Sequence, residues 1–280
     1  MTGRRGSFGL QWRAGKPPLV MGILNVTPDS FSDGGRFHTL DAAVARGVDL
    51  VSQGADMLDI GGESTRPGSQ PVLLEEELRR TIPVIEGLSR RVSVPLSIDT
   101  AKSEVARRAL AAGASLINDV TALRGDPAMA SVAAQSRCGV ILMHMRGEPR
   151  TMQQRPRYAD VAADVAAFLK SAAARAQRAG IHASRILIDP GIGFGKTLAH
   201  NLRILSRLDD LVKLGYPVVL GASRKSFIGK LTGAAVDQRL PGSLACLAVA
   251  REAGAAVVRV HDVAEAKQFL EVTEAIGAAA

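Results

Sequence analysis

Several short apolar runs in this chain end in polar side chains that would suit a flat, polar ring held beside an anion. Asp99, Asn118 and Asp189 offer carboxylate and amide groups, which pair with the N–H groups of a heterocycle and reject molecules that lack them. Arg259 and His261 stand two positions apart, so on a strand their side chains point to the same side. A guanidinium at such a position favours an anionic group such as phosphate.

Other roles for these residues stay open. Asp99 precedes a predicted helix by three residues, so it can equally be a helix cap. His144 suits either a general base or a core histidine with satisfied hydrogen bonds. The segment GIGFGK at 191–196 lacks the ending of a P-loop, and we interpret its glycines as allowing a tight turn that points Phe194 into a pocket. No Ser–His–acid set or carboxylate pair is indicated, which disfavours hydrolysis by those routes.

The elements that must position these residues alternate regularly. Eight short apolar runs, typical of strands covered on both faces, alternate with helical segments at intervals of roughly 30 residues. Such alternation predicts an α/β fold, a (β/α)8 TIM barrel in a single domain, with a doubly wound open sheet as the alternative. The predicted strands are 19–24, 57–60, 95–98, 115–117, 139–143, 185–188, 217–220 and 256–260. The predicted helices are 39–53 with Thr39 as cap, 74–88, 102–112, 127–135, 160–179, 198–208, 240–253 and 263–276.

In such a barrel the residues at the carboxyl ends of the strands share one rim, where barrels place their sites. We therefore expect a pocket lined by Asn25, Glu63, Asp99, Asn118, His144, Asp189, Lys225 and His261. Arg259 lies inside an apolar strand, which argues for a function, whereas Arg224 is expected to be a solvated charge.

Residues 1–18 are predicted to be an N-terminal hairpin extension, and residues 19–280 the barrel. Two short extended pieces between Ser7 and Pro18, on either side of Ala14-Gly15, form the expected hairpin. Trp12 in this segment is expected to act as a hydrophobic lid rather than as a binding residue.

Composition narrows the classes of function. The 280 residues carry a net charge of +8 and the pI is about 10.0, but the basic residues are dispersed and aromatics make up only 4%, so nucleic acid is not the expected partner. A basic surface that attracts small anions fits better. The chain has no run of 18 apolar residues and no signal-peptide pattern, so we expect a cytoplasmic protein without a membrane partner. Cys138 and Cys246 are expected to be buried free thiols.

The residues and motifs above resemble those of the dihydropteroate synthase family. The matching segments, in family order from about Met21 to Val263, are MGILNVTPDSFSDGG, DIGGESTRPG, SIDT, INDV, LMHM, LIDPGIGFGK, GASRKSFIG and RVHDV. The resemblance implies a pterin-binding barrel that transfers a dihydropterin-methyl group (EC 2.5.1.15 type). The donor is its diphosphate ester, the acceptor is the amine of 4-aminobenzoate, and the reaction uses Mg2+ in folate biosynthesis. It also implies a homodimer and a sulfonamide target.

The resemblance implies a role for each matching residue. The pterin is expected on Asp99, Asn118, Asp189 and Lys225, with Met143 and Phe194 on its faces. The diphosphate is expected on Asn25, Arg259 and His261, with Asn25 also ligating Mg2+. The aminobenzoate site is expected to comprise Phe31, Thr65, Arg66, Pro67, Lys225 and Ser226. Asp33, Lys225, Arg259 and His261 are the expected catalytic residues, and the loops 27–36 and 63–71 are expected to close over the site.

Two other functions share part of this pattern. A pterin-binding domain that passes a methyl group to a corrinoid would have the same barrel, but it would not need the STRPG and SRKSF segments or the pair Arg259 and His261. A protein that only binds pterins would not need the full set of diphosphate residues.

Overall fold

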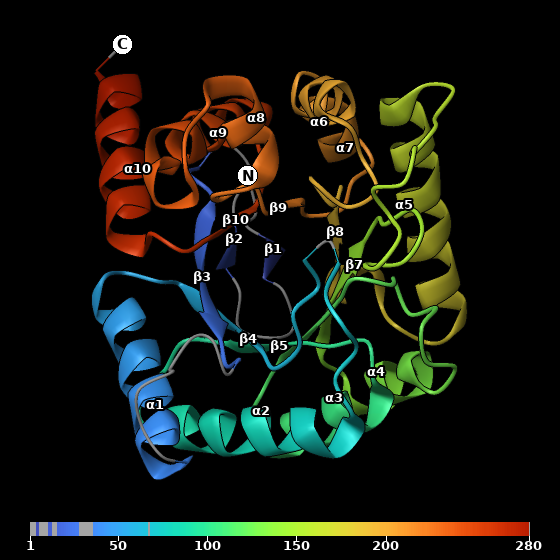
Figure 1. The fold of residues 1–280 in the computed structure, drawn as a ribbon, viewed down its shortest axis with the longest axis vertical. Helices are drawn as coiled ribbons and strands as arrows, with labels where there is room; N and C mark the ends of the chain where they lie inside the picture. The colour runs from blue at the N-terminus through green and yellow to red at the C-terminus, as the bar shows by residue number, and fades with distance from the viewer. Residues whose placement is uncertain (1–3, 6–10, 13–15, 28–35, 67, 280) are drawn as a thin grey trace.

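Helices surround a central set of strands in the computed structural model of this chain (Figure 1). The structure describes residues 4–5, 11–12, 16–27, 36–66 and 68–279, except for the side chains of residues 4, 5, 11 and 36–39. The larger sheet contains the strands β3 (Leu19–Asn25), β4 (Met57–Gly61), β5 (Leu96–Asp99), β6 (Leu116–Asp119), β7 (Gly139–Met143), β8 (Ile186–Asp189), β9 (Val219–Leu220) and β10 (Val257–Val260).

These eight strands form a parallel barrel. Their order is β8-β7-β6-β5-β4-β3-β10-β9, and every pairing is parallel. A parallel bridge between Ile188 and Val218 joins the two ends of this order. The predicted (β/α)8 barrel is therefore confirmed, and the open doubly wound sheet is wrong.

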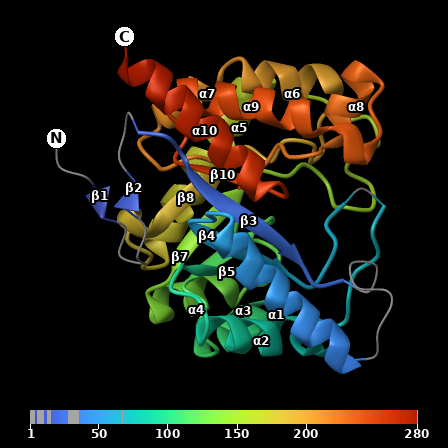
Figure 2. The ribbon, with the colours of Figure 1, turned by 90° about the vertical axis from the view of Figure 1, so that its left-hand side faces the viewer.

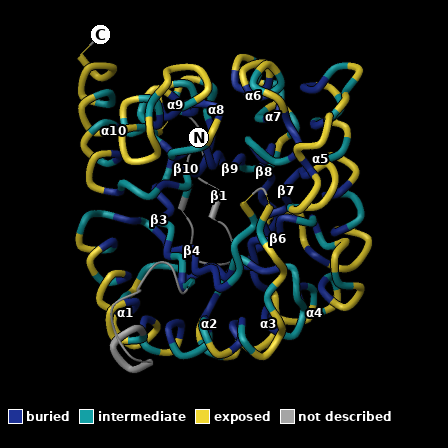
Figure 3. Tube along the Cα trace, in the orientation of Figure 1, coloured by how far each residue is buried: buried dark blue, intermediate teal, exposed yellow. Residues whose placement is uncertain are grey.

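Alternation along the strands divides the core into two layers. Outward residues such as Leu58 and Val258 pack with the helices in one large cluster. Inward residues fill the barrel with a second cluster, whose members are Met21, Met57, Leu116, Ile141, Leu187, Val219, Ala256 and Val257. Figure 3 shows the buried strands at the centre and the exposed outer sides of the helices. Because side chains alternate with period two, the inward position two residues further along each strand lies closer to the carboxyl rim.

The helices mostly follow the prediction, with three main differences. They are α1 (Arg36–Ser52), α2 (Leu74–Ser89), α3 (Ser103–Ala111), α4 (Met129–Ser136), α5 (Val161–Arg178), α6 (Leu198–Leu205), α7 (Leu208–Val212), α8 (Ser226–Thr232), α9 (Leu240–Ala253) and α10 (Val263–Ala278), with 3-10 turns at Ala183–Arg185 and Val236–Gln238. Helix α1 begins at Arg36, so Thr39 is not its cap. The segment predicted as one helix over 198–208 is split between α6 and α7, and α8 was predicted as loop. Among the described residues, no helix is both long and apolar enough to cross a membrane.

A short antiparallel pair precedes the barrel. Strand β1 (Arg4–Arg5) pairs with β2 (Gln11–Trp12), with Arg4 opposite Trp12. The hairpin therefore lies earlier than the expected turn at Ala14-Gly15, and those two residues are outside the described part of the chain. Trp12 packs against the cluster inside the barrel, together with Leu19, which confirms its expected role as a hydrophobic cover. In Figure 2 this pair lies at the opposite end of the barrel from the carboxyl ends of β3 and β4.

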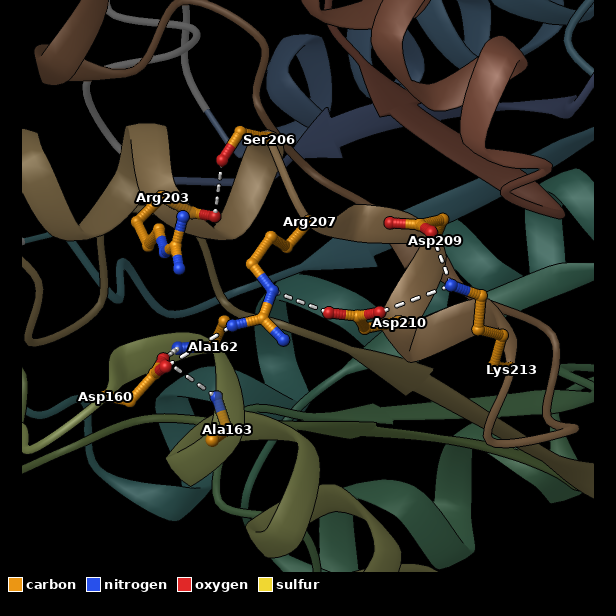
Figure 4. A network of polar contacts seen from close by, with 9 residues as sticks. All are labelled: Asp160, Ala162, Ala163, Arg203, Ser206, Arg207, Asp209, Asp210 and Lys213. Carbon is orange, nitrogen blue, oxygen red and sulfur yellow. Dashed lines mark hydrogen bonds and ion pairs between the residues drawn. The ribbon is translucent and has the colours of Figure 1, made fainter.

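Ion pairs on the outside join neighbouring helices. Asp160 caps α5 by accepting from the backbone N–H groups of Ala162 and Ala163. Arg207, between α6 and α7, donates to Asp160 (3.3 Å) and to Asp210 (2.7 Å), as Figure 4 shows. Because these side chains are a third or more exposed, such pairs contribute at most about 1 kcal/mol each.

Candidate active site

Four adjacent strands place their last inward positions side by side at the carboxyl rim. The register pairs Asn25 with Gly61, Gly61 with Asp99, and Asp99 with Asn118. Because position 61 is glycine, no side chain separates its neighbours. A Cβ atom there would lie 3.9 Å from Asn25 Oδ1 and 3.8 Å from Asp99 Oδ2. Oxygen atoms of Asn25 and Asp99 therefore face a common space above the apolar cluster.

Arg259 connects two carboxylates at this rim. Its Nε donates to Asp59 Oδ2 (2.6 Å) and its Nη2 donates to Asp99 Oδ2 (2.9 Å). Asn118 Nδ2 donates to the same Asp59 oxygen (2.9 Å). Burial by itself would lower the pKa of Arg259, but Asp59 and Asp99 raise it, so the guanidinium stays charged. Burial and the charge of Asp59 raise the pKa of Asp99 to about 7, against the opposing effect of Arg259.

Asp99 is thus a pocket residue and not a helix cap. Lys102 precedes α3, and the backbone N–H of Ser103 donates to Asp126 instead (2.8 Å).

Asp189 and Lys225 form the other side of the site. Asp189 Oδ1 accepts from the backbone N–H of Gly191 (2.6 Å), and burial raises the pKa of Asp189 while Lys225 lowers it. Lys225 Nζ donates to the carbonyl of Ile192 and lies 4.6 Å from the centroid of the Phe194 ring. Burial lowers the pKa of Lys225 to about 8, although Asp189 opposes this effect.

Phe194 packs against an apolar cluster that includes Met143, Met145 and Met152. An apolar surface with a carboxylate and an ammonium at its edge suits a flat ring that carries polar atoms on its perimeter.

His261 continues the inward row of β10 beyond Arg259. Its Nδ1 lies 3.0 Å from Ser223 Oγ, and its backbone N–H donates to the same hydroxyl (3.2 Å). Burial, and then the charge of Arg259, lower the pKa of His261 to about 4, and Arg66 adds to this effect. Three arginines, Arg259, Arg224 and Arg66, therefore act on the space around a neutral imidazole. Such a surface favours an anion.

Arg224 is not the solvated charge that was expected. Its guanidinium forms a bidentate pair with Asp262, with 2.9 Å between Nε and Oδ2.

Two residues expected at the pocket point elsewhere. Glu63 pairs with Lys102, which also binds the fully buried Glu77 of α2 (2.5 Å). His144 Nδ1 lies 2.9 Å from Lys196 Nζ, and its ring contacts Phe168 edge-on at 4.8 Å. Burial and the charge of Lys196 lower the pKa of His144 to about 3. His144 is therefore a neutral core histidine with satisfied hydrogen bonds, which was the second of the two roles left open.

The structure describes only some of the residues expected to bind aminobenzoate. Thr65 is half-buried and Arg66 exposed on the loop after β4, and Ser226 is exposed at the first position of α8, directly after Lys225. Phe31, Asp33 and Pro67 lie outside the described residues, and so does most of the expected closing loop 27–36.

Asp59 is the site residue that the sequence interpretation missed. It is fully buried and binds both Arg259 and Asn118, while its Oδ1 has no hydrogen-bond partner among the described residues. The signal was present, because a carboxylate stands inside the otherwise apolar run MLDIG. An ionised group in a buried strand needs a charged partner.

Comparison with known proteins identifies the family. The family model described as pterin binding enzyme matches residues 21–261. The dihydropteroate synthase of Escherichia coli (strain K12) is 47% identical over 258 residues, which cover 92% of this chain and 91% of that protein. A solved structure of Xanthomonas albilineans dihydropteroate synthase with 4-aminobenzoic acid is 50% identical, with a TM-score of 0.92 and 99% of both chains covered. This chain belongs to the dihydropteroate synthase family.

A second Xanthomonas albilineans dihydropteroate synthase structure, in complex with 7,8-dihydropteroate, is 49% identical with a TM-score of 0.85, and covers 95% of this chain and 96% of that one. The stretch matched by the family model starts at Met21, four residues before Asn25, and ends at His261. It therefore contains every described residue that was expected at the site.

Proposed function

We propose that this enzyme condenses (7,8-dihydropterin-6-yl)methyl diphosphate with 4-aminobenzoate, giving 7,8-dihydropteroate and diphosphate for folate biosynthesis. The observation that carries the proposal is that one rim holds two kinds of binding group, one for a polar ring and one for an anion. Asp99, Asn118 and Asp189 present acceptors and a donor for the edge of a pterin, and Arg259 and His261 lie beside them on β10. The substrate has the same two parts, a flat ring and an anionic tail.

Each set of residues at the site is assigned to one part of the two substrates. The pterin ring is held by Asp99, Asn118, Asp189 and Lys225, between the apolar surfaces of Met143 and Phe194. The diphosphate is held by Asn25, Arg259 and His261. The acceptor amine enters beside Lys225, in a site formed by Phe31, Thr65, Arg66, Pro67 and Ser226.

The reaction breaks the bond between the pterin methylene carbon and the diphosphate oxygen, and the bonding electrons leave with the diphosphate. Arg259 stabilises this developing charge, and Asp59 and Asp99 fix the orientation of its guanidinium. Asp33 stabilises the electron-poor methylene. The lone pair of the neutral aromatic amine then forms the new C–N bond, and its extra proton passes to solvent. No strong base is required, which agrees with a buried, neutral His144.

Mg2+ is the proposed cofactor, and the oxygen ligands that the site offers fit this ion. Mg2+ prefers oxygen ligands and is usually held by one or two protein groups together with substrate phosphates, so a cage of several carboxylates is not needed. Among the described residues no cluster of three or more His, Cys, Asp or Glu side chains suits a metal, whereas the carboxamide oxygen of Asn25 faces the open space beside Gly61. When bound, Mg2+ would neutralise charge on the departing diphosphate.

The direct test mixes the purified enzyme with the pterin diphosphate, 4-aminobenzoate and Mg2+, and follows diphosphate release. We expect release that depends on the amine and that falls in Lys225→Ala and Arg259→Ala variants. Release without formation of dihydropteroate would contradict the proposal. Methyl transfer to a corrinoid, or pterin binding without turnover, would point to the two other functions considered above.

We further propose a cytoplasmic homodimer that binds neither nucleic acid nor membrane and is a target of sulfonamides. Residues 1–18 are proposed to be an extension to a barrel of residues 19–280. Light scattering tests the dimer, and competition between a sulfonamide and 4-aminobenzoate tests the drug site.

A further inference from the structure

Lys196 is a buried cation that the proposed chemistry leaves without a role. It is the last residue of the GIGFGK segment and is 2% exposed. Its Nζ lies 2.8 Å from the Gly191 carbonyl oxygen, 3.0 Å from that of Phe194 and 3.3 Å from that of His144. It also lies 2.9 Å from His144 Nδ1. Lys196 therefore joins both ends of the turn 191–194 to the residue that follows β7.

The turn lies directly against that strand end. Gly191 and Gly195 have φ of +65° and +62°, a conformation that favours glycine. A Cβ atom would overlap the carbonyl oxygen of His144 at the first position and that of Arg146 at the second. Backbone carbonyls thus converge in a space without water access, where a single donor with several hydrogens satisfies them.

These contacts do not depend on the charge of Lys196. Burial and Lys225 lower its pKa, whereas Asp189 raises it. As an ammonium it donates to the two nearer carbonyls, those of Gly191 and Phe194, and to His144 Nδ1. As an amine it donates to the same two carbonyls and accepts from His144 Nδ1, which then carries the ring proton. In both cases the same groups are joined.

The shape of this turn determines where the pterin-binding groups lie. The carbonyl of Ile192, inside the turn, accepts from Lys225 Nζ, and the Phe194 ring lies under the same ammonium. Asp189 Oδ1 accepts from Gly191 N–H at the start of the turn. Arg259 and His261, in contrast, are held by Asp59, Asp99 and Ser223, which do not belong to it.

We propose that Lys196 is a positioning residue that fixes the 191–194 turn against β7, so that Asp189, Phe194 and Lys225 meet the pterin ring. The inference rests on the proposed function. It separates the pterin half of the site, which needs Lys196, from the diphosphate half, which does not.

The test compares Lys196→Met with wild type by calorimetric binding of two probes, pteroate and inorganic diphosphate with Mg2+. We expect pteroate binding to weaken about tenfold or more, because displacement of binding groups by a fraction of an ångström is costly. Diphosphate binding should stay within about twofold of wild type. The matched control is Lys170→Met, which removes an exposed lysine from α5 and should change neither affinity.

Unchanged pteroate affinity in Lys196→Met would overturn the inference, and so would a parallel loss of both affinities, which indicates general disruption. If Lys196→Met does not fold, His144→Ala decides, since it removes one partner of Lys196 and keeps the carbonyls. It should weaken pteroate a few-fold, by roughly the worth of one hydrogen bond, without affecting diphosphate. Failure of wild type to bind pteroate would instead contradict the proposed function.

Discussion

Asp59 is the residue at which the two halves of the site meet. One of its oxygens accepts from Arg259, on the proposed diphosphate side, and from Asn118, on the proposed pterin side. The orientations of the Arg259 guanidinium and the Asn118 amide therefore depend on the same carboxylate. A neutral residue of the same shape would leave the buried guanidinium with one carboxylate partner instead of two.

We accordingly expect Asp59→Asn to lower kcat/KM by about 10- to 100-fold, because the buried guanidinium loses one of its two negative charges and an uncharged amide oxygen is a weaker acceptor. Coupled diphosphate release measures the effect. Asp209→Asn, on an exposed side chain of α7, is the control and should match wild type. Wild-type activity in Asp59→Asn would show that Arg259 is positioned by other means.

The ionisation of Asp99 and Lys225 predicts a narrow pH profile. Asp99, with its pKa raised to about 7, must lose its proton to accept from the pterin, so kcat/KM should rise as pH passes about 7. Lys225, with its pKa lowered to about 8, must keep its proton, so kcat/KM should fall as pH passes about 8. Lys225→Arg should remove the alkaline fall, because arginine remains charged. A constant kcat/KM between pH 5 and 9 would disprove these assignments.

At the scale of elements, Lys102 joins three parts of the barrel wall. It stands before α3 and binds Glu77 of α2 together with Glu63 at the root of the loop after β4. Arg80 of α2 also donates to the carbonyl of Gly62 (2.8 Å). These contacts hold the start of the proposed aminobenzoate loop to a helix rather than to the pocket.

Lys102→Met should lower the free energy of unfolding by about 3 kcal/mol, because Glu77 would remain as a buried carboxylate without its cation. Urea denaturation measures this change. The comparison variant is Lys213→Met, whose pairs with Asp209 and Asp210 are exposed and which should lose less than about 1 kcal/mol. Equal stability of the two variants would show that Glu77 does not need Lys102 as its partner.

At the scale of the whole molecule, the sequence predicted the barrel well because parallel strands are apolar on both faces. The ends of these apolar runs predicted that Asp99, Asn118, Asp189 and His261 lie at the carboxyl ends of strands, as they do in the structure. Spacing could not tell which polar side chains turn inward. Glu63 and His144 follow strand ends too, but Lys102 and Lys196 draw them away from the pocket. Asp59 was missed because its run is otherwise apolar, and α8 because its seven residues, Ser226–Thr232, are too few to show a helical period and include Gly229.

One end of the barrel contributes to stability, and the opposite end holds the candidate active site. Trp12 covers the interior cluster at the end opposite the site, so Trp12→Ala should cost about 2 kcal/mol of unfolding free energy and leave kcat within about twofold of wild type. Thermal unfolding and steady-state kinetics check the two parts. A large loss of kcat at full stability would place Trp12 in the catalytic machinery instead.

Gly61 gives the molecule a position where folding and ligand fit are independent. An alanine methyl there would make ordinary van der Waals contacts, the nearest at 3.6 Å to Asp99 Cβ, and the backbone would accept it without strain. That methyl would nevertheless lie between Asn25 Oδ1, at 3.9 Å, and Asp99 Oδ2, at 3.8 Å. A Gly61→Ala chain should therefore keep the yield and heat tolerance of its parent while it loses affinity for ligands at the rim.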